Sequence, residues 1–240
     1  ILPLALTIVG GIMIRSTELT RPVTEWWQHW VIGVIGLALA LAIACWRYEK
    51  LLDWHWVTYG LTNLSLIVVL IIGTTVNGAQ SWISFLGFNI QPSEFAKLGL
   101  IITLAAVLHN RPASSLSAVG KALAIAAVPW FLVFIQPDLG TSLVFGAITL
   151  TMLYWANANP GWILLLISPF VSVILFSAYF SGWIAWTAIM VFIAWRTLPL
   201  SWYGAIGALV MNLGSGELGH IVWGLLKTYQ KNRLISFLHP

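Results

Sequence analysis

The sequence has 240 residues, of which 60% are hydrophobic and only 8% are charged. Soluble domains carry about 25% charged residues, so this composition excludes a water-soluble globular protein and predicts that lipid is the solvent for much of the chain. The formal net charge of +4 is modest and spread along the sequence, and no basic run suggests a nucleic-acid partner.

Roughly nine apolar segments follow one another, most of them near the length of about 20 residues that a helix needs to cross a membrane. Most are apolar all round, and none has the alternating pattern of a membrane barrel strand. We therefore predict an all-α, polytopic helical bundle, with residues 1–240 forming a single transmembrane domain. The first segment starts inside an apolar run, so we expect a helix that is cut short. The segments are 1–14, 30–46, 56–76, 92–109, 121–136, 139–158, 161–180, 182–196 and 201–226.

If every segment crosses the membrane, the connections between them fall on two sides. The first side has the connections at 46–56, 109–121, 157–160 and 196–199. The second side receives the connections at 15–29, 74–91 and 136–140, the turn near Ser181, and residues 227–240. Five Lys and Arg residues fall on the first side and six on the second. The excess of positive charge that marks cytoplasmic loops therefore does not fix the orientation.

The connection at 74–89 is long and rich in apolar residues, including Trp82, Ile83, Phe85 and Phe88. Such a segment is poorly suited to lie in water. We expect 74–97 to be a loop that lies in the membrane interface or re-enters the protein, followed by a helix start.

The segment Gln-Pro-Ser-Glu-Phe-Ala-Lys at 91–97 predicts a helix that begins at Pro92, because proline suits the first helical turn. Glu94 then lies near the positive end of the helix dipole, and Lys97 shares its face. We predict that Glu94 and Lys97 lie within reach of each other or of Asp138, facing a cavity. Two interpretations stay open: a dipole-stabilised start with a snorkelling lysine, or a cavity floor where Lys97 meets an anionic head group.

The segment Gln-Pro-Asp-Leu-Gly-Thr at 136–141 opens the next predicted helix, and Asp138 is the only acidic residue between Glu94 and Glu217. The preceding helix contains Pro129, which frees a backbone carbonyl and permits a bend. Asp138 is either a helix cap, or a carboxylate that binds a cation or orients Lys97.

Two more features lie towards the end of the chain. Residues 161–196 predict a helical hairpin that turns near Ser181 and Gly182. Glu217 and His220 share a helical face, and we expect a satisfied buried pair. The basic segment at 227–233 is either an interfacial anchor or a site for lipid phosphates. The sequence has no Walker loop, no His-Glu-x-x-His motif and no Cys/His metal cluster.

Four segments, in this order, resemble motifs of the SEDS family of rod-shape, division and sporulation proteins. They lie at 77–83, 91–97, 136–141 and 229–233. The resemblance implies a peptidoglycan glycosyltransferase that polymerises lipid II beside a class B penicillin-binding protein. It places the protein in the bacterial inner membrane with the motif loops extracytoplasmic. The residues Leu-Gly-Thr-Ser that follow Asp138 most resemble the rod-shape branch of the family.

The same resemblance implies a set of residues that bind the substrate or support the site: Gln91, Glu94, Lys97, Gln136, Asp138, Lys231 and Arg233. Asp138 could also hold a divalent cation, Mg²⁺ or Mn²⁺. The family's proposed catalytic acid would lie beyond Pro240, in a large extracytoplasmic loop that starts at 227–240. The hairpin at 161–196 is additional to the family pattern, and Ser81 stands where the family usually has arginine.

Three other functions stay open at this point. A lipid II flippase would also need a polar cavity among membrane helices. A paralogue of the cell-division branch would use the same motifs. A non-catalytic scaffold for the penicillin-binding protein would keep the fold without the chemistry.

Overall fold

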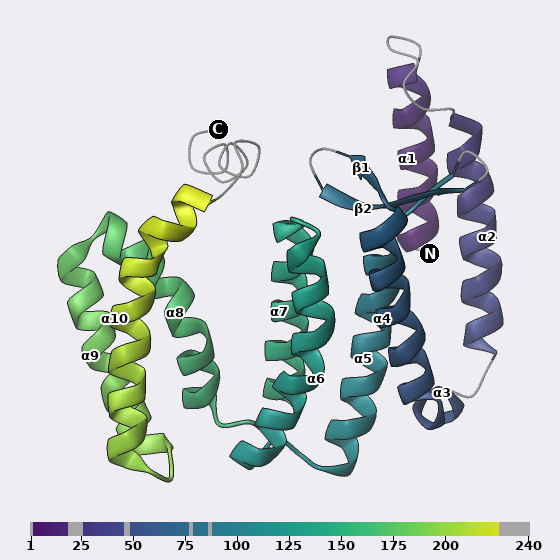
Figure 1. Ribbon diagram of the computed structural model, residues 1–240. Helices are drawn as coiled ribbons and strands as arrows, with labels where there is room; N and C mark the ends of the chain where they lie inside the picture. Colours follow the sequence, from purple (N-terminus) through teal and green to yellow (C-terminus); the bar gives the residue numbers. More distant parts are fainter. Residues whose placement is uncertain (1, 19–25, 46–48, 77–78, 86–87, 226–240) are drawn as a thin grey trace. The chain divides into compact units, whose positions relative to one another are not determined.

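A computed structural model describes residues 2–18, 26–45, 49–76, 79–85 and 88–225 (Figure 1). The chain divides into two compact units, Ile1–Leu51 and Leu52–Pro240, and each is described by itself. A short helix, α3 (Glu49–Asp53), lies at the division between them. The predicted grouping of the whole chain into one transmembrane domain stays a prediction.

The first unit is a pair of packed helices, α1 (Leu2–Glu18) and α2 (Trp26–Ala44). Glycine lets them approach, because a Cβ added at Gly11 would come within 2.6 Å of the Trp30 ring. His29 Nε2 donates to the Thr7 carbonyl at 2.9 Å. The Arg15 guanidinium lies 5.2 Å from the centre of the Trp26 ring. The pair therefore combines close small-residue packing with polar contacts, as membrane helices commonly do.

The second unit contains seven long helices within its described residues, one for each remaining predicted segment. They are α4 (His55–Ile72), α5 (Pro92–Asn110), α6 (Leu116–Ile135), α7 (Leu139–Trp155), α8 (Pro160–Ala178), α9 (Phe180–Thr197) and α10 (Ser201–Leu225). In the described part of the chain, five helices are long and apolar enough to cross a membrane: α2, α4, α5, α6 and α8. The prediction of a polytopic helical protein is confirmed.

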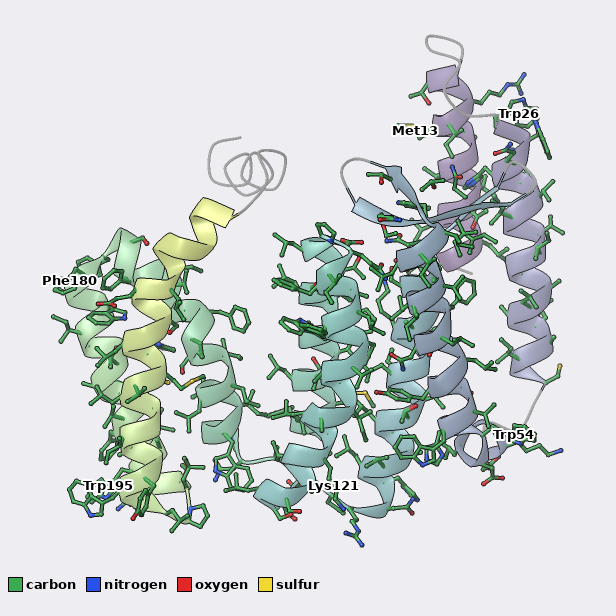
Figure 2. The ribbon with its side chains drawn as sticks, in the orientation of Figure 1. Met13, Trp26, Trp54, Lys121, Phe180 and Trp195 are labelled. Carbon is green, nitrogen blue, oxygen red and sulfur yellow. The ribbon has the colours of Figure 1, made fainter. Side chains whose placement is uncertain are left out.

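The second unit has two ends, because successive helices run in opposite directions (Figure 1). We call one the sheet end; it holds the connections at 73–91 and 136–138 and the junction at Tyr179. The opposite end holds the connections at 110–115, 156–159 and 198–200. Trp54, Lys121 and Trp195 lie at the opposite end (Figure 2). The grouping of these connections agrees with the two sides predicted from the sequence.

The main core lies between α4, α5, α6 and α7. Its fully buried members include Leu66, Leu100, Leu104, Val133 and Phe145. On the outer faces of these helices, many large apolar side chains are exposed. A soluble protein would not tolerate so many exposed apolar side chains. This pattern fits a bundle that buries one stripe of each helix and turns the rest towards lipid.

Gly99 sets the distance between α4 and α5. A Cβ at Gly99 would collide with Thr62 Oγ1 and lie 3.0 Å from Thr62 Cγ2. We expect Gly99→Ala to destabilise the protein by about 1 kcal/mol or more, because the extra methyl overpacks this interface. Thermal unfolding in detergent measures the loss.

Two further variants separate overpacking from a general effect of alanine. Gly146 on α7 has nothing within 4 Å of an added Cβ, so Gly146→Ala should be neutral or stabilising. Thr62→Ala should restore much of the stability lost in Gly99→Ala. Equal losses at Gly99 and Gly146 would contradict this account.

Proline inside α6 leaves one carbonyl without its helical donor. Pro129 has no N–H for the carbonyl of Ile125, four residues earlier. The Tyr59 hydroxyl, on α4, donates to that Ile125 oxygen at 2.8 Å. A membrane offers no water for a freed carbonyl, so a neighbouring hydroxyl is the natural partner. The bend permitted by Pro129 is thereby tied to α4.

Tyr59→Phe should therefore destabilise the fold by about 1 kcal/mol, since it leaves the Ile125 carbonyl unpaired. The same substitution should cost much less in a Pro129→Ala background, where the helix supplies its own N–H. Thermal unfolding of the four proteins in this cycle gives the coupling. Tyr154→Phe, which removes a hydroxyl from an exposed ring, is the matched control. Additive losses would show that the two residues act independently.

The connection at 74–90 is not a loop, which corrects the sequence prediction. It forms a three-stranded antiparallel sheet in the order β1 (Thr74–Val76), β2 (Ala79–Phe85), β3 (Phe88–Ile90). Strand β2 contacts α4 and α5. The Thr, Val, Trp, Ile and Phe residues that made the segment look too apolar for a loop are also strand formers. The Asn-Gly pair at 77–78 is the sequence signal that predicts such a hairpin.

Helices α8, α9 and α10 pack closely on one another. At their centre, Ser172 Oγ donates to Asn212 Oδ1 at 2.5 Å. Asn212 Nδ2 donates to Ser168 Oγ at 3.3 Å and to the Ala208 carbonyl at 2.8 Å. Ser168 Oγ donates to the carbonyl of Leu165, which Pro169 leaves free. These buried bonds fix the pairing of α8 with α10.

The range 161–196 contains two helices, as predicted for a hairpin, but the break lies elsewhere. It falls at Tyr179, which is extended at φ −154° and ψ 83°, and not at Ser181 and Gly182. Gly182 lies inside α9, and a Cβ there would collide with the Tyr179 ring. Glycine therefore makes room for the aromatic ring at the break and does not itself form the turn.

Candidate functional site

The start of α5 places a cation and an anion side by side. Gln91 is the extended N-cap residue, Pro92 occupies the first turn, and Glu94 lies in that same turn. Lys97 Nζ lies 2.8 Å from each of the two Glu94 carboxylate oxygens. The predicted contact between these residues is therefore confirmed, and the prediction that the pair faces a cavity stays a prediction. The Lys97 side chain is 21% exposed and that of Glu94 is 57% exposed, so the cation is the more enclosed member of the pair.

The start of α7 is capped by Asp138. Its Oδ1 accepts from the Thr141 backbone N–H at 3.1 Å, and its Oδ2 accepts from the Thr141 hydroxyl at 2.8 Å. The Ser142 hydroxyl adds a 2.8 Å bond to the Asp138 carbonyl. The capping interpretation of Asp138 is confirmed. Asp138 also makes a contact outside its own helix, with Gln91.

A side-chain hydrogen bond joins the two helix starts. Gln91 Nε2 donates to Asp138 Oδ2 at 3.0 Å, across 47 positions of sequence. Asp138 thus accepts three hydrogen bonds and holds the start of α5 against the start of α7. Both starts lie at the sheet end, where the positive ends of the two helix dipoles favour an anion.

Gln136 lies in the core and not on an open surface. Its side chain is 1% exposed, and its Nε2 donates to the Leu66 carbonyl at 3.1 Å. This bond ties the end of α6 to α4. In the described structure, Gln136 Oε1 is buried without a hydrogen-bond partner. The hydroxyl of Ser93, in the motif at 91–97, is also buried without one. Binding of substrate by Gln136 stays a prediction.

Ser81 is the extra residue of a β-bulge. Thr74 lies opposite Trp82 and Thr75 lies opposite Gln80, so Ser81 has no counterpart on β1. Its side chain is buried, at 1% exposure. A bulge re-aims one side chain of a strand, and here it turns this position inward. No local pattern in the sequence predicts this placement.

Two other predictions concern the end of the chain. Lys231 and Arg233 lie outside the described residues. Glu217 is exposed, which corrects the prediction of a buried Glu217–His220 pair, and the His220 side chain is not described. The buried face of α10 is formed here by Gly216 and Gly219, which meet Phe176 and Val173 of α8. Glu217 follows Gly216 directly and is turned away from α8.

The site does not fit a metal held by the protein alone. Among the described residues, no three His, Cys, Asp or Glu side chains gather in one place. The carboxylate oxygens of Asp138 already accept three hydrogen bonds. What the arrangement offers is two helix N-termini joined by the Gln91–Asp138 bond, and a partly enclosed lysine in the second turn of α5. This combination can stabilise negative charge, such as that on a diphosphate.

Comparison with known proteins identifies relatives of this chain. The family model of FtsW, RodA and SpoVE, described as a cell cycle protein, matches residues 1–218. The peptidoglycan glycosyltransferase RodA of Treponema pallidum is 30% identical over 276 aligned residues, covering 99% of this chain and 62% of that protein. A probable peptidoglycan glycosyltransferase FtsW of Allochromatium vinosum is 36% identical, covering 73% of this chain and 48% of that protein. The chain thus spans about half to two thirds of these relatives.

Solved structures share the fold. The rod shape determining protein RodA of Thermus thermophilus aligns with a TM-score of 0.58 at 21% identity, covering 94% of this chain and 85% of that one. A structure that shows coordination of polymerisation and crosslinking by a peptidoglycan synthase complex aligns with a TM-score of 0.59 at 26% identity. It covers 100% of this chain and 58% of that one. The polytopic membrane fold is therefore shared with these proteins.

Proposed function

We propose that this chain, which belongs to the FtsW/RodA/SpoVE family, is part of a peptidoglycan glycosyltransferase that polymerises lipid II during elongation and rod-shape maintenance. The observation that carries the proposal is the Gln91–Asp138 bond, which joins two family motifs at the sheet end; Lys97 belongs to the first of these motifs. The RodA relative, which aligns over 99% of this chain, supports the rod-shape branch over the division branch.

The proposed reaction joins a sugar hydroxyl to an anomeric carbon. The hydroxyl oxygen attacks that carbon, the bond from the carbon to the lipid diphosphate breaks, and the hydroxyl proton passes to a base. Lys97 would stabilise the charge on the departing diphosphate, together with the N-termini of α5 and α7. Asp138 would act as a positioning residue, because its bond to Gln91 holds the two starts together.

Neither Glu94 nor Asp138 is proposed to act as the general base, because both carboxylates already have partners. Glu94 is paired with Lys97, and Asp138 accepts three hydrogen bonds. A divalent cation, Mg²⁺ or Mn²⁺, would be held mainly by the substrate diphosphate, which is the usual way that proteins bind Mg²⁺ with few carboxylates. No step of the proposed reaction depends on it.

The proposal also places the sheet end on the extracytoplasmic side of the inner membrane. This orientation rests on the family resemblance alone, because the Lys and Arg residues, five on one side and six on the other, do not fix it. A class B penicillin-binding protein is the proposed partner, supported by the likeness to a complex that coordinates polymerisation and crosslinking.

The function is tested with the purified full-length protein and lipid II. We expect glycan strands whose length grows with time, separated by gel electrophoresis. Movement of lipid II between the leaflets of a vesicle, without any glycan, would identify a flippase instead. Binding of the penicillin-binding protein without glycan or lipid movement would identify a scaffold.

A further inference from the structure

A groove runs along the outer face of α9 and α10, away from the Lys97 site. It has a volume of about 320 Å³ and is lined by Ala188, Val191, Phe192, Trp195, Trp202 and Ala205. All six side chains are apolar. Phe192, Trp195 and Trp202 are strongly exposed, so the groove opens towards the surroundings of the bundle. In a membrane protein those surroundings are lipid, and the occupant must be apolar.

The groove is somewhat shorter than one leaflet is thick. On α9 it extends from Ala188 to Trp195, a rise of about 10 Å at 1.5 Å per residue. It starts at the opposite end of the unit, where Trp195 lies (Figure 2). Half of a hydrocarbon core is about 15 Å thick, so the groove covers most of one leaflet and stops short of the midplane.

The groove is shallow and open, and a single hydrocarbon chain is thin enough to lie in its volume of about 320 Å³. The cation beside it, Arg196, is what favours a lipid as the occupant.

A cation lies where the head group of such a lipid would be. Arg196 follows Trp195 directly in the last turn of α9, and its side chain is exposed. Trp195 and Trp202 both line the groove, and tryptophan favours the level of the head groups. The connections at 110–115, 156–159 and 198–200, which share this end, contain no Asp or Glu. The local charge therefore favours an anionic head group.

We propose that the α9–α10 groove binds one acyl chain of an anionic phospholipid, with Arg196 holding its phosphate. The lipid would be bound between α9 and α10 and would be distinct from the polymerisation substrate. The proposal is independent of the proposed function, because it rests on a different face and a different end of the unit.

The test uses full-length protein, incubated with phosphatidylglycerol or phosphatidylcholine and examined by native mass spectrometry. Ala188→Phe, which fills the groove, should lower retained phosphatidylglycerol at least fivefold. Arg196→Gln should remove the preference for phosphatidylglycerol over phosphatidylcholine. Ala185→Phe, an exposed position on α9 beyond the groove, and Lys121→Gln, a cation at the same end, are matched controls that should behave as wild type.

Three results would overturn the proposal. One is unchanged phosphatidylglycerol retention in Ala188→Phe and also in the milder Ala188→Leu. Another is equal retention of both lipids by the wild-type protein. The third is loss of a second copy or of a co-purified protein from Ala188→Phe while lipid retention stays constant, which would make the groove a protein-docking site. Thermal unfolding of each variant confirms that only folded protein is compared.

Discussion

Exchanging the two charges at the start of α5, by Glu94→Lys together with Lys97→Glu, should leave the protein folded but lower lipid II polymerisation. The positions are three apart in either order, so the ion pair can form again. The cation would move from the 21% exposed position to the 57% exposed one. A hydrogen bond to a charged group is worth about 1.5–3 kcal/mol, so we expect a loss of roughly 10- to 150-fold.

The exchange separates a substrate contact from a structural ion pair. Initial rates of glycan formation by the purified full-length protein, at saturating lipid II, give the loss. Thermal unfolding checks the fold, and placing lysine near the positive helix end should cost no more than about 1 kcal/mol. Lys121→Gln removes a cation at the opposite end and should leave the rate unchanged. Wild-type turnover by the exchanged protein would assign Glu94 and Lys97 a purely structural role.

Asp138→Asn should also preserve the fold while reducing activity by about tenfold or more, which corresponds to 1.4 kcal/mol in the barrier. Asparagine caps a helix about as well as aspartate, so the bond to the Thr141 N–H can persist. The amide cannot accept from both Gln91 and the Thr141 hydroxyl, as Asp138 Oδ2 does. Gln91 would have to reverse its amide, and the negative charge between the helix starts would be lost.

A second cap provides the control for Asp138. Asn159 caps α8 at the opposite end, where its side chain accepts from the Gly161 N–H at 2.8 Å. Asn159→Ala should lower the unfolding temperature but leave the rate of the folded protein unchanged. If well-folded Asp138→Asn polymerises lipid II at the wild-type rate, then Asp138 is a cap and nothing more. A Gln91→Ala variant should reproduce part of the loss, since it removes the link to α5.

The helices were largely predictable because lipid imposes a simple rule on the sequence. A spanning segment must satisfy its backbone internally and present apolar side chains, so Leu, Ile, Val, Ala and Trp runs mark helices with little ambiguity. Helix starts were equally clear at Pro92 and Leu139, where proline and aspartate precede apolar runs. The ion pair of Glu94 with Lys97 followed from helical spacing alone.

The predictions were wrong where contacts between elements, and not the local sequence pattern, decide the structure. The apolar residues at 74–90 predict a segment that avoids water, and only the Asn-Gly pair at 77–78 indicates that this segment forms a hairpin. The break between α8 and α9 was placed at Gly182, whereas packing of the Tyr179 ring against that glycine puts it three residues earlier. Glu217 was expected to be buried because its sequence neighbours are small, yet those neighbours are what face α8.

By itself, the sequence determined that this protein spans a membrane, which segments form its helices, and which motif residues share a helical face, although the starts of α2, α6 and α9 lie two to five residues before the predicted ones. Each of these depends on composition or on spacing within one helix. Only the tertiary structure decided that Gln91 bonds Asp138 and that Tyr59 takes the carbonyl freed by Pro129. Those partners are 47 and 66 positions apart. Such contacts depend on how helices pack in space, and a local pattern in the chain does not encode the neighbour of a given face.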